Sequence, residues 1–254
     1  MPALTGKTAL ITGASRGIGR YTAQRLARDG ARIAVHYGKN AQAAEAVVAA
    51  IESDGGSAFA VQADLAQPHA AEALWKAFDA QADGVDILIN NAGEVVYGRV
   101  DEMLEEDFDR LFAVNVKAPM FIIQHGLHRL RDGGRIINLS SAAAHLASPM
   151  ATMYSATKGA LSTLTRTVAW TVGGRGITVN AVAPGFTETA MNEWFADPAA
   201  KAWAAGQSAL GRVAQPSDIG DVIAFLASDD ARWISGQIID ATGGGLLGSP
   251  QAAG

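Results

Sequence analysis

Short apolar runs alternate with longer helical patterns along the whole chain of 254 residues, and this alternation is the feature that most constrains its fold. Because the side chains of a strand point alternately to its two faces, a run that is apolar throughout is typical of a strand covered on both faces. Strands joined through helices lie parallel in one sheet. The expected strands are 8–13, 32–37, 57–64, 85–93, 134–141, 177–185 and 236–244. The pattern predicts an α/β fold, a doubly wound parallel sheet of seven strands with helices on both faces, and ligands at the carboxyl ends of the strands.

The sequence shows no linker and no internal repeat, so we expect a single domain over residues 1–254. A net charge of −5 without blocks of like charge disfavours nucleic acid and an anionic membrane surface as partners. No run approaches the ~18 apolar residues of a membrane span, and the opening MPALTGKTAL lacks the apolar core of a signal peptide. We therefore expect a cytoplasmic protein. The chain has no cysteine, which excludes disulfides, thiol catalysis and thiolate metal sites.

The first expected strand runs directly into TGASRGIG (residues 12–19), and a helical pattern over about 17–29 follows. Glycines at 13, 17 and 19 allow a tight turn and a close backbone approach, so that a pyrophosphate can lie at the helix N-terminus. A purely structural turn is the alternative. The spacing is not the G-x-x-x-x-G-K-[ST] of a P-loop, which excludes a P-loop nucleotidase.

The segment 31–44 contains no Asp or Glu, although an NAD site would place an acid there for the ribose 2′-hydroxyl. It offers instead the run His36–Lys39, and Arg16 lies in the glycine turn. Cations match the 2′-phosphate of NADP(H) better, while ordinary solvated surface charges are the alternative. We therefore expect NADP(H) as the cofactor.

Tyr154 stands four positions before Lys158 in MYSATKGA. On a helix these positions share a face, so an ammonium would lie beside a phenol and lower its pKa from about 10. A chance pairing is the alternative, but the pair suits a proton donor. A metal site at His125 and His128 fits poorly because no acid accompanies them, and NLSSA is not the G-x-S-x-G elbow of a serine hydrolase. We expect no metal.

Together with NNAG (90–93), Asp64-Leu65 and PGFTET (184–189), these motifs resemble the short-chain dehydrogenase/reductase family over nearly the whole chain. The wording is closest to bacterial members similar to 3-oxoacyl-acyl-carrier-protein reductases. The resemblance implies a Rossmann fold and hydride transfer between NADPH and a carbonyl or alcohol substrate. Two alternatives remain: an NAD(P)-dependent sugar or polyol dehydrogenase, and a catalytically silent sensor that binds the cofactor.

The resemblance also implies a catalytic tetrad of Asn115, Ser141, Tyr154 and Lys158, with a Ser-to-Tyr spacing of 154 − 141 = 13. Tyr154 would act as general acid, and Lys158 would lower the pKa of the phenol and bind the nicotinamide ribose. Ser141 would polarise the carbonyl, and Asn115 would hold a water that relays protons. Ser140 competes with Ser141 but lacks the spacing, and a structural role for Asn115 is the alternative.

The motifs place the cofactor contacts at Gly13, Ser15, Arg16, Gly17, Ile18, Gly19, Tyr37, Lys39, Asp64, Leu65, Asn91, Ala92, Gly93, Tyr154, Lys158, Pro184, Gly185, Thr187 and Thr189. The segment at about 186–212 interrupts the α/β alternation and is interpreted as a lid over the active site, with a packed helical insertion as the alternative. The residues expected to face the substrate are Glu94, His145, Phe186, Met191 and Trp194.

An acyl-carrier protein would need a local basic patch, for which the candidates are Arg129, Arg131, Arg166 and Arg175. The helical pattern over 160–172 is apolar on more than one face, which favours burial against a partner, and members of the family are usually tetramers. We therefore expect a homotetramer, with a buried helix in a monomer as the alternative. The tail 247–254 is expected to be mobile or docked on a neighbour.

Overall fold

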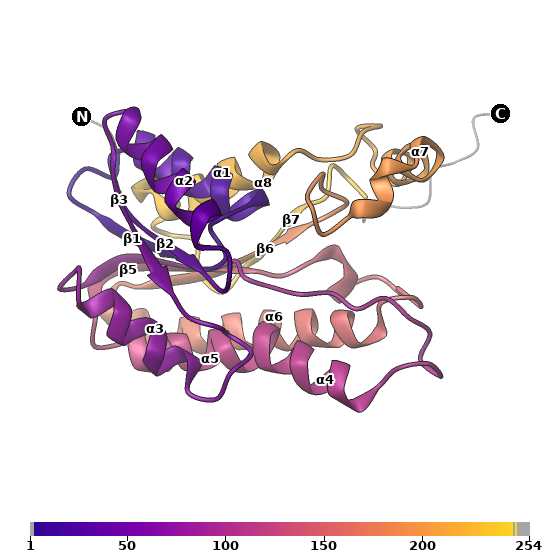
Figure 1. Ribbon diagram of the computed structural model, residues 1–254, viewed down its shortest axis with the longest axis horizontal. Helices are drawn as coiled ribbons and strands as arrows, with labels where there is room; N and C mark the ends of the chain where they lie inside the picture. Colours follow the sequence, from indigo (N-terminus) through magenta and orange to yellow (C-terminus); the bar gives the residue numbers. More distant parts are fainter. Residues whose placement is uncertain (1–2, 246, 248–254) are drawn as a thin grey trace.

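Seven parallel strands form one sheet in the order β3-β2-β1-β4-β5-β6-β7 (Figure 1). This computed structural model describes residues 3–245 and 247. The strands are β1 (Thr8–Ile11), β2 (Arg32–Tyr37), β3 (Ser57–Gln62), β4 (Val85–Asn90), β5 (Leu130–Leu139), β6 (Thr178–Pro184) and β7 (Ile238–Ala241). All seven expected strands are present, and the predicted fold is confirmed. Most end earlier than their apolar patterns do, because the residues that follow leave the sheet and line a cleft at its carboxyl edge.

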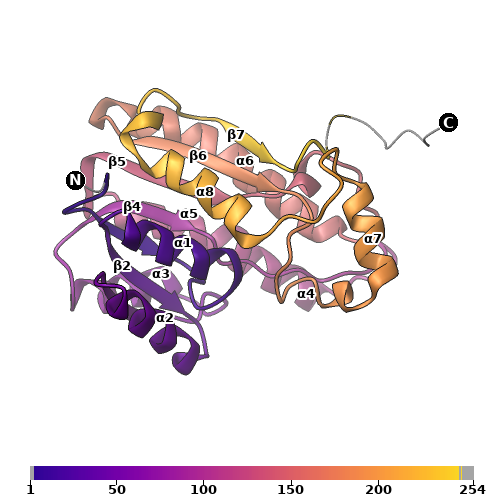
Figure 2. The same ribbon diagram turned by 90° about the horizontal axis from the view of Figure 1, so that it is seen from above.

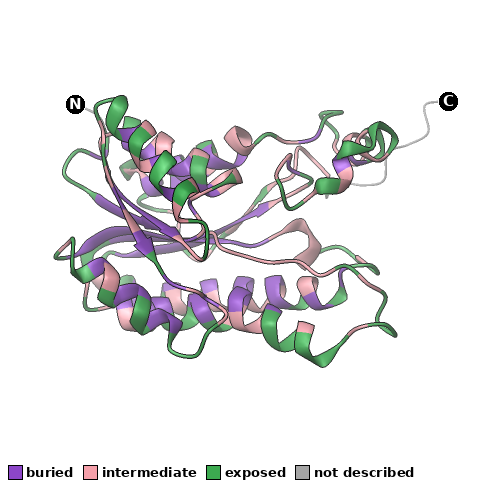
Figure 3. Cartoon of the chain, in the orientation of Figure 1, coloured by how far each residue is buried: buried purple, intermediate pink, exposed green. Residues whose placement is uncertain are grey.

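Helices cover both faces of the sheet, as Figure 1 shows. On one face lie α1 (Gly17–Arg28), α2 (Ala41–Ser53) and α8 (Pro216–Ala227). On the other lie α3 (Ala70–Asp79), α4 (Glu105–Phe112), α5 (Ala118–Gly126) and α6 (Thr152–Val172). Consecutive residues of a strand belong to the apolar cores on opposite faces of the sheet. Leu10 packs with α3, α5 and α6, whereas Ile11 packs with α1, α2 and α8. This two-sided burial, visible as the purple sheet of Figure 3, is why the strand sequences are apolar throughout.

A single wide turn of π-helix, Ala113–Lys117, joins α4 to α5. Such turns insert an extra residue into a helix and often occur at functional sites. Here the turn buries Asn115 against α6, on the side toward the carboxyl edge of the sheet. The period of the hydrophobic pattern does not reveal this irregularity.

Between β6 and α8 the chain leaves the sheet and forms a short 3-10 turn, Glu193–Ala196, and the helix α7 (Pro198–Gly206). Figure 2 shows α7 at the end of the molecule where the strands terminate. The segment has its own small aromatic core, in which the ring centroids of Phe186 and Trp194 are 5.6 Å apart and those of Phe186 and Trp203 are 5.4 Å apart.

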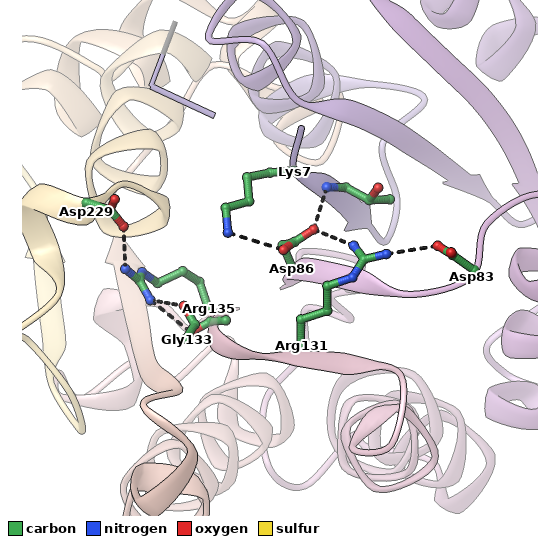
Figure 4. A network of polar contacts seen from close by, with 9 residues as sticks. Lys7, Asp83, Asp86, Arg131, Gly133, Arg135 and Asp229 are labelled. Atoms are coloured by element: carbon green, nitrogen blue, oxygen red, sulfur yellow. Dashed lines mark hydrogen bonds and ion pairs between the residues drawn. The ribbon is translucent and has the colours of Figure 1, made fainter. Parts of the chain in front are cut away.

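At the edge of the sheet opposite to the cleft, charged side chains form hydrogen bonds and ion pairs between the amino ends of the strands (Figure 4). The buried carboxylate of Asp86 accepts hydrogen bonds from the backbone N–H of Thr8 (2.9 Å), from Lys7 Nζ (3.3 Å) and from Arg131 Nη1 (2.8 Å). Arg131 also donates to Asp83 (2.9 Å). This network connects β1, β4 and β5, and it lies far from the cleft.

Within the described residues, no helix is long and apolar enough to cross a membrane. The expected helix over 160–172 forms as the second half of α6. Leu161, Ala169 and Val172 are buried, whereas Trp170 is 93% exposed. The expectation for the tail falls, from residue 248 onward, outside the described part of the chain.

Candidate active site

A cleft of about 1090 Å³ opens along the carboxyl ends of the strands. All the residues expected to contact the cofactor line it except Tyr37. Tyr37 instead packs against the apolar core under α1, α2 and α8, which corrects its assignment as a cofactor contact. The topology explains the gathering, because residues that directly follow parallel strands all lie at one edge of the sheet.

The glycine turn between β1 and α1 is held in a defined shape by its neighbours. Gly13 has a φ of +63°, a conformation that favours glycine. A Cβ on Gly19 would lie 2.4 Å from the carbonyl oxygen of Gly13, so the start of α1 packs directly on the turn. The side-chain amide of Asn91, just after β4, donates to the carbonyl oxygens of Thr12 (2.8 Å) and Gly13 (3.1 Å). The NNAG motif therefore fixes the turn as well as lining the cleft.

Helix α1 begins at this turn with backbone donors that no described side chain caps, and its first turn carries no acid. The first N–H groups of a helix lack partners within the helix, and together with the helix dipole they form an anion site. The cleft wall here is built from Ser15, Gly17 and Ile18. This end of the cleft is suited to a pyrophosphate.

Two exposed cations, Arg16 and Lys39, stand at the same end of the cleft, and no described carboxylate pairs with either of them. Asn40, which the sequence reasoning did not select, caps α2 by accepting a hydrogen bond from the N–H of Ala43 (2.9 Å). His36 is not a third surface cation. Its ring is buried, and burial lowers its pKa to about 4.

Tyr154 and Lys158 share a face of α6 as expected, with Lys158 Nζ 5.5 Å from the centroid of the Tyr154 ring. The Lys158 ammonium is buried and donates to the carbonyl oxygen of Leu139 (2.7 Å) at the end of β5. Burial lowers the pKa of Lys158 to about 8, so the ammonium form still predominates at neutral pH. A Cβ on Gly93 would lie 3.4 Å from Lys158 Nζ, and glycine there leaves space beside the ammonium.

The pKa of Tyr154 differs from the sequence-based expectation. Burial raises it to about 12, and a side-chain hydrogen bond with Ser141 opposes this rise without cancelling it. The expected lowering by Lys158 is therefore not the dominant effect in this environment. A phenol with this pKa carries its proton at neutral pH, which is the form that a general acid needs.

Ser141 lies just beyond β5 and faces the cleft. Its Oγ accepts a hydrogen bond from the N–H of Ala143 (3.2 Å), which leaves the hydroxyl proton for another acceptor. Ser140 has a different role. It is buried, donates to the carbonyl oxygen of Lys158 (3.2 Å) and lies 2.8 Å from Ser162 Oγ, so it joins β5 to α6. The geometry favours Ser141 over Ser140 as the polarising group.

Asn115 is held in the π-helical turn by three hydrogen bonds. Its amide donates to the carbonyl oxygen of Glu94 (2.9 Å) and to Thr157 Oγ1 (3.1 Å), and its Oδ1 accepts from the N–H of Glu94 (2.9 Å). Thr157 in turn donates to the carbonyl oxygen of Tyr154 (2.7 Å). Both amide protons are therefore used by the chain, and the side chain positions the loop after β4 against the helix of Tyr154. The side-chain amide of Asn115 therefore has a positioning role, and its expected role in holding a water for proton relay stays a prediction.

The residues expected at the substrate end fall into two groups. Phe186 and Met191 line the cleft. Trp194 packs in the aromatic core beside Phe186, and neither it nor His145 is among the residues that line the cleft, so both differ from the expectation. Glu94 lines the cleft, but its carboxylate is neutralised by a two-pronged ion pair.

That ion pair joins Glu94 to Arg110 of α4, with distances of 2.7 and 2.6 Å. The pKa of Arg110 is raised by the Glu94 hydrogen bond and charge, and also by the charge of Asp64. The Glu94 carboxylate therefore faces a cation of α4 inside the cleft, and its role as a substrate contact stays a prediction.

Sequence reasoning missed several large side chains of the cleft. Tyr97, Leu146, Met150, Trp203 and Leu210 all line it and are substantially exposed. The signals were present in part: Tyr97 follows NNAG, and Leu146 and Met150 lie between Ser141 and Tyr154. Within the described residues, no three His, Asp or Glu side chains come together as a metal site.

Comparison with known proteins agrees with this geometry. A family model described as enoyl-(acyl carrier protein) reductase matches residues 13–245. The chain belongs to the short-chain dehydrogenase/reductase family of enzymes, as its motifs predicted.

Its relatives include an uncharacterized oxidoreductase of Methylorubrum extorquens, 43% identical over 246 residues, which cover 96% of this chain and 99% of that protein. The versicolorin reductase of Emericella nidulans is 42% identical over 253 residues, covering 95% of this chain and 96% of that protein. Among solved structures, the angucycline C-6 ketoreductase LanV with bound NADP has a TM-score of 0.93 at 48% identity, covering 97% of this chain and 98% of that one.

Proposed function

We propose that the protein reduces a ketone to an alcohol, with NADPH as the hydride donor. The observation that carries this proposal is the arrangement at one cleft: a protonated Tyr154 with Ser141 and Lys158 beside it, and an uncapped helix N-terminus with free cations at the far end. The relatives that are ketone reductases, LanV among them with NADP, support it.

The residues present fit NADP(H). The start of α1 offers free N–H groups for the pyrophosphate, and Arg16 and Lys39 offer charge for the 2′-phosphate. At the other end, glycine at 93 leaves the Lys158 ammonium open to the ribose hydroxyls. The sequence-based expectation of NADP(H) rather than NAD(H) agrees with this donor set.

When bound, NADPH supplies the hydride. Tyr154 donates its proton to the carbonyl oxygen, and the Ser141 hydroxyl donates a hydrogen bond to the same oxygen, where negative charge develops. The Lys158 ammonium keeps positive charge behind the phenol as that proton leaves. The raised pKa of Tyr154 keeps the phenol in the protonated form that reduction of a carbonyl uses near neutral pH.

We further propose that the substrate is an apolar, ring-bearing ketone. The wall of the cleft beyond Tyr154 carries large exposed apolar side chains: Tyr97, Leu146, Met150, Phe186, Met191 and Trp203. Such a surface binds flat apolar rings well, whereas a sugar or polyol needs convergent polar groups. The names of the relatives, versicolorin reductase and angucycline ketoreductase, agree with this class.

A 3-oxoacyl thioester is the second candidate, because the matching family model is described as an acyl-carrier-protein reductase. Three of the four Arg residues of the expected docking patch, however, form ion pairs within the chain. Arg129 pairs with Asp79, Arg131 with Asp83 and Asp86, and Arg175 with Asp132. These guanidinium groups already have carboxylate partners, which disfavours them as a site for an acidic carrier protein.

We interpret the segment 186–212 as a lid over the substrate end of the cleft, because Phe186, Met191 and Trp203 contribute to its wall. A homotetramer in the cytoplasm completes the proposal. A catalytically silent sensor is disfavoured, since Ser141, Tyr154 and Lys158 are all present at one site.

A turnover assay tests the proposal. We would follow oxidation of NADPH and of NADH with a bicyclic aromatic ketone, an acetoacetyl thioester and a sugar. We expect turnover with NADPH and the ring ketone, little with the sugar, and a rate about 10² to 10⁴ times lower in Tyr154→Phe. Thioester reduction alone would favour the second candidate, and NADPH binding without turnover of any substrate would favour the sensor.

A further inference from the structure

His36, near the carboxyl end of β2, is buried below the glycine turn and makes two hydrogen bonds through its ring. Nδ1 accepts from the backbone N–H of Gly13 (2.9 Å), and Nε2 lies 2.9 Å from the carbonyl oxygen of Ala63. An N–H can only donate and a carbonyl can only accept, so the ring is neutral with its proton on Nε2. The ring thereby connects the segment that follows β1 to the segment that follows β3.

Together with a contact from Asn91, these hydrogen bonds hold Gly13 through both of its backbone polar groups. The N–H of Gly13 is bound by His36, and its carbonyl oxygen is bound by the side chain of Asn91 (3.1 Å). The next residue, Ala14, also donates its N–H to the backbone oxygen of His36 (2.9 Å). Gly13 is thus held from β2 on one side and from β4 on the other, in the positive-φ conformation that turns the chain into α1.

We propose that His36 is a positioning residue for cofactor binding, acting through the Gly13 N–H on the turn that receives the pyrophosphate. This rests on the proposed use of NADPH. With its N–H occupied by His36, Gly13 cannot rotate to point that donor elsewhere, and the free N–H groups at the start of α1 are directed into the cleft. Without this contact a buried N–H would lack a partner, and the turn would adopt other conformations to satisfy it.

Two amide substitutions separate the two ring contacts. In His36→Asn the amide oxygen takes the place of Nδ1 and keeps the Gly13 contact, but the side chain is too short to reach Ala63. In His36→Gln the amide nitrogen reaches the place of Nε2 and keeps the Ala63 contact, but no acceptor faces Gly13. Each variant therefore loses one buried hydrogen bond, and we expect similar falls in the melting temperature of the cofactor-free protein.

Cofactor affinity should separate the variants. We would titrate each protein with NADPH by fluorescence and expect the dissociation constant to rise about tenfold in His36→Gln, the loss of roughly one hydrogen bond, and less than about threefold in His36→Asn. The KM for NADPH should follow the same order, while kcat at saturating NADPH stays within about twofold. Amide exchange at Gly13 should be faster in His36→Gln than in His36→Asn.

Equal losses of affinity in the two variants, or losses that follow their melting temperatures, would show that His36 acts only through stability and would overturn the proposal. If His36→Gln does not fold, His36→Leu replaces it, since leucine is similar in size and makes neither contact, and its NADPH affinity is then compared with that of His36→Asn. A wild-type protein that does not bind NADPH would instead refute the proposed function, so the two failures are distinguishable.

Discussion

At Tyr154 two effects on one phenol compete, and burial dominates. The sequence places Lys158 on the same helical face and predicts a lowered pKa, but the ammonium donates to the carbonyl oxygen of Leu139 at the end of β5, and desolvation of the partly buried phenol raises its pKa instead. Desolvation destabilises the phenolate, and this raises the pKa of Tyr154 by more than one hydrogen bond from Ser141 lowers it. The four-residue spacing therefore predicted that Tyr154 and Lys158 lie side by side. It did not predict the protonation balance, which depends on burial by chain segments far away in sequence.

The first prediction concerns Tyr154→Phe. The change removes one hydroxyl and little volume, so we expect the fold and the NADPH dissociation constant to stay within a few-fold of wild type. Turnover should fall by about 10² to 10⁴, the usual contribution of general acid catalysis. Single-turnover kinetics with saturating NADPH measures this, with Ser155→Ala on the same helix as a control. Wild-type rates in Tyr154→Phe would show that another group donates the proton.

The second prediction concerns pH. Burial lowers the pKa of Lys158 to about 8, so the side chain is charged below that pH and neutral above it. We expect NADPH affinity and kcat/KM for NADPH to fall as the pH rises through about 8, because a neutral amine binds ribose hydroxyls and supports the phenol less well. The group titrates in the free enzyme, which kcat/KM reports.

Lys158→Met provides the control for this profile. It lacks the titrating amine, so its low residual kcat/KM should not change around pH 8. If the variant shows the same decline as the wild type, the titration belongs to another group. Tyr154 does not interfere in this range, since its pKa of about 12 lies well above it.

At the scale of elements, the position of a site residue could be predicted from the sequence when its partners lie in the same helix or strand-turn unit. It could not be predicted when the residue depends on a contact between two elements. The glycine turn, NNAG and the Tyr-Lys pair each lie within one strand-turn or one helix, and the structure brings them to the cleft. Asn115 depends on a π-helical turn that hydrophobic spacing cannot show. Glu94 depends on Arg110, sixteen positions later on α4, whose ion pair neutralises its carboxylate.

A third prediction concerns the contact between the segment 186–212, which we propose as a lid, and the loop after β4. Tyr97 donates to Asn192 Oδ1 (3.2 Å), and Asn192 donates to the carbonyl oxygen of Thr187 (2.9 Å). Tyr97→Phe removes this bridge while keeping the ring. We expect the KM for a ring ketone to rise about two- to tenfold, since one exposed hydrogen bond contributes roughly 0.5 to 1.5 kcal/mol. The NADPH dissociation constant should not change.

Tyr21→Phe is the matched control for Tyr97→Phe. Its hydroxyl also makes one exposed hydrogen bond, to Asp221 (3.1 Å), but on the surface between α1 and α8. The control should leave the ketone KM unchanged. A ketone KM that is the same in both variants would contradict a role for the Tyr97 hydroxyl in holding the lid.

The fourth prediction concerns the network at the amino ends of the strands. Asp86→Ala leaves a buried backbone N–H and the charges of Lys7 and Arg131 without their shared partner (Figure 4). We expect a loss of about 2 kcal/mol in the free energy of unfolding, measured by urea denaturation, because a buried N–H without an acceptor is costly, whereas Lys7 and Arg131 are 46% and 42% exposed. The activity of the folded fraction should stay the same, since the network lies at the far edge of the sheet.

Asp83→Ala is the control for Asp86→Ala. Its side chain is 97% exposed and makes a single ion pair with Arg131, so its removal should cost less than about 1 kcal/mol. Equal losses in the two variants would show that burial of Asp86 does not set the strength of the network.

At the scale of the whole molecule, the order of the strands determines where the cleft lies. Contacts between distant segments determine which charged and apolar side chains remain free to bind a partner or a substrate. The seven-stranded parallel sheet and the cleft at its carboxyl edge followed from the alternation of apolar runs and helices. The basic patch did not follow as expected, because Arg129, Arg131 and Arg175 pair across the fold with Asp residues that the sequence does not place beside them, whereas Arg166 pairs with no described carboxylate. Nor did the apolar cleft wall, which assembles Tyr97, Met150 and Trp203 from three separate segments.

The last prediction is the homotetramer. A closed tetramer with dihedral symmetry needs at least two different self-complementary faces, and the structure has two separate apolar surfaces. One lies on α4 and α5 and exposes Phe108, Met120 and Phe121; the other lies at α8 and β7 and exposes Phe225 and Trp233, the latter 97% exposed. The edge strand β7 borders the second surface, and unpaired edges favour association.

Charge substitutions on each face test this assembly by light scattering. We expect Phe121→Glu to stop at dimers through the α8 and β7 face, and the pair Phe225→Glu and Trp233→Glu to stop at dimers through the α4 and α5 face. Combining the three should give monomers, because each substitution places an unpaired charge in an apolar contact. Val100→Glu, on an exposed loop, should remain a tetramer. A wild-type mass of one chain at micromolar concentration would refute the tetramer, and a tetramer that survives all three substitutions would place its interfaces elsewhere.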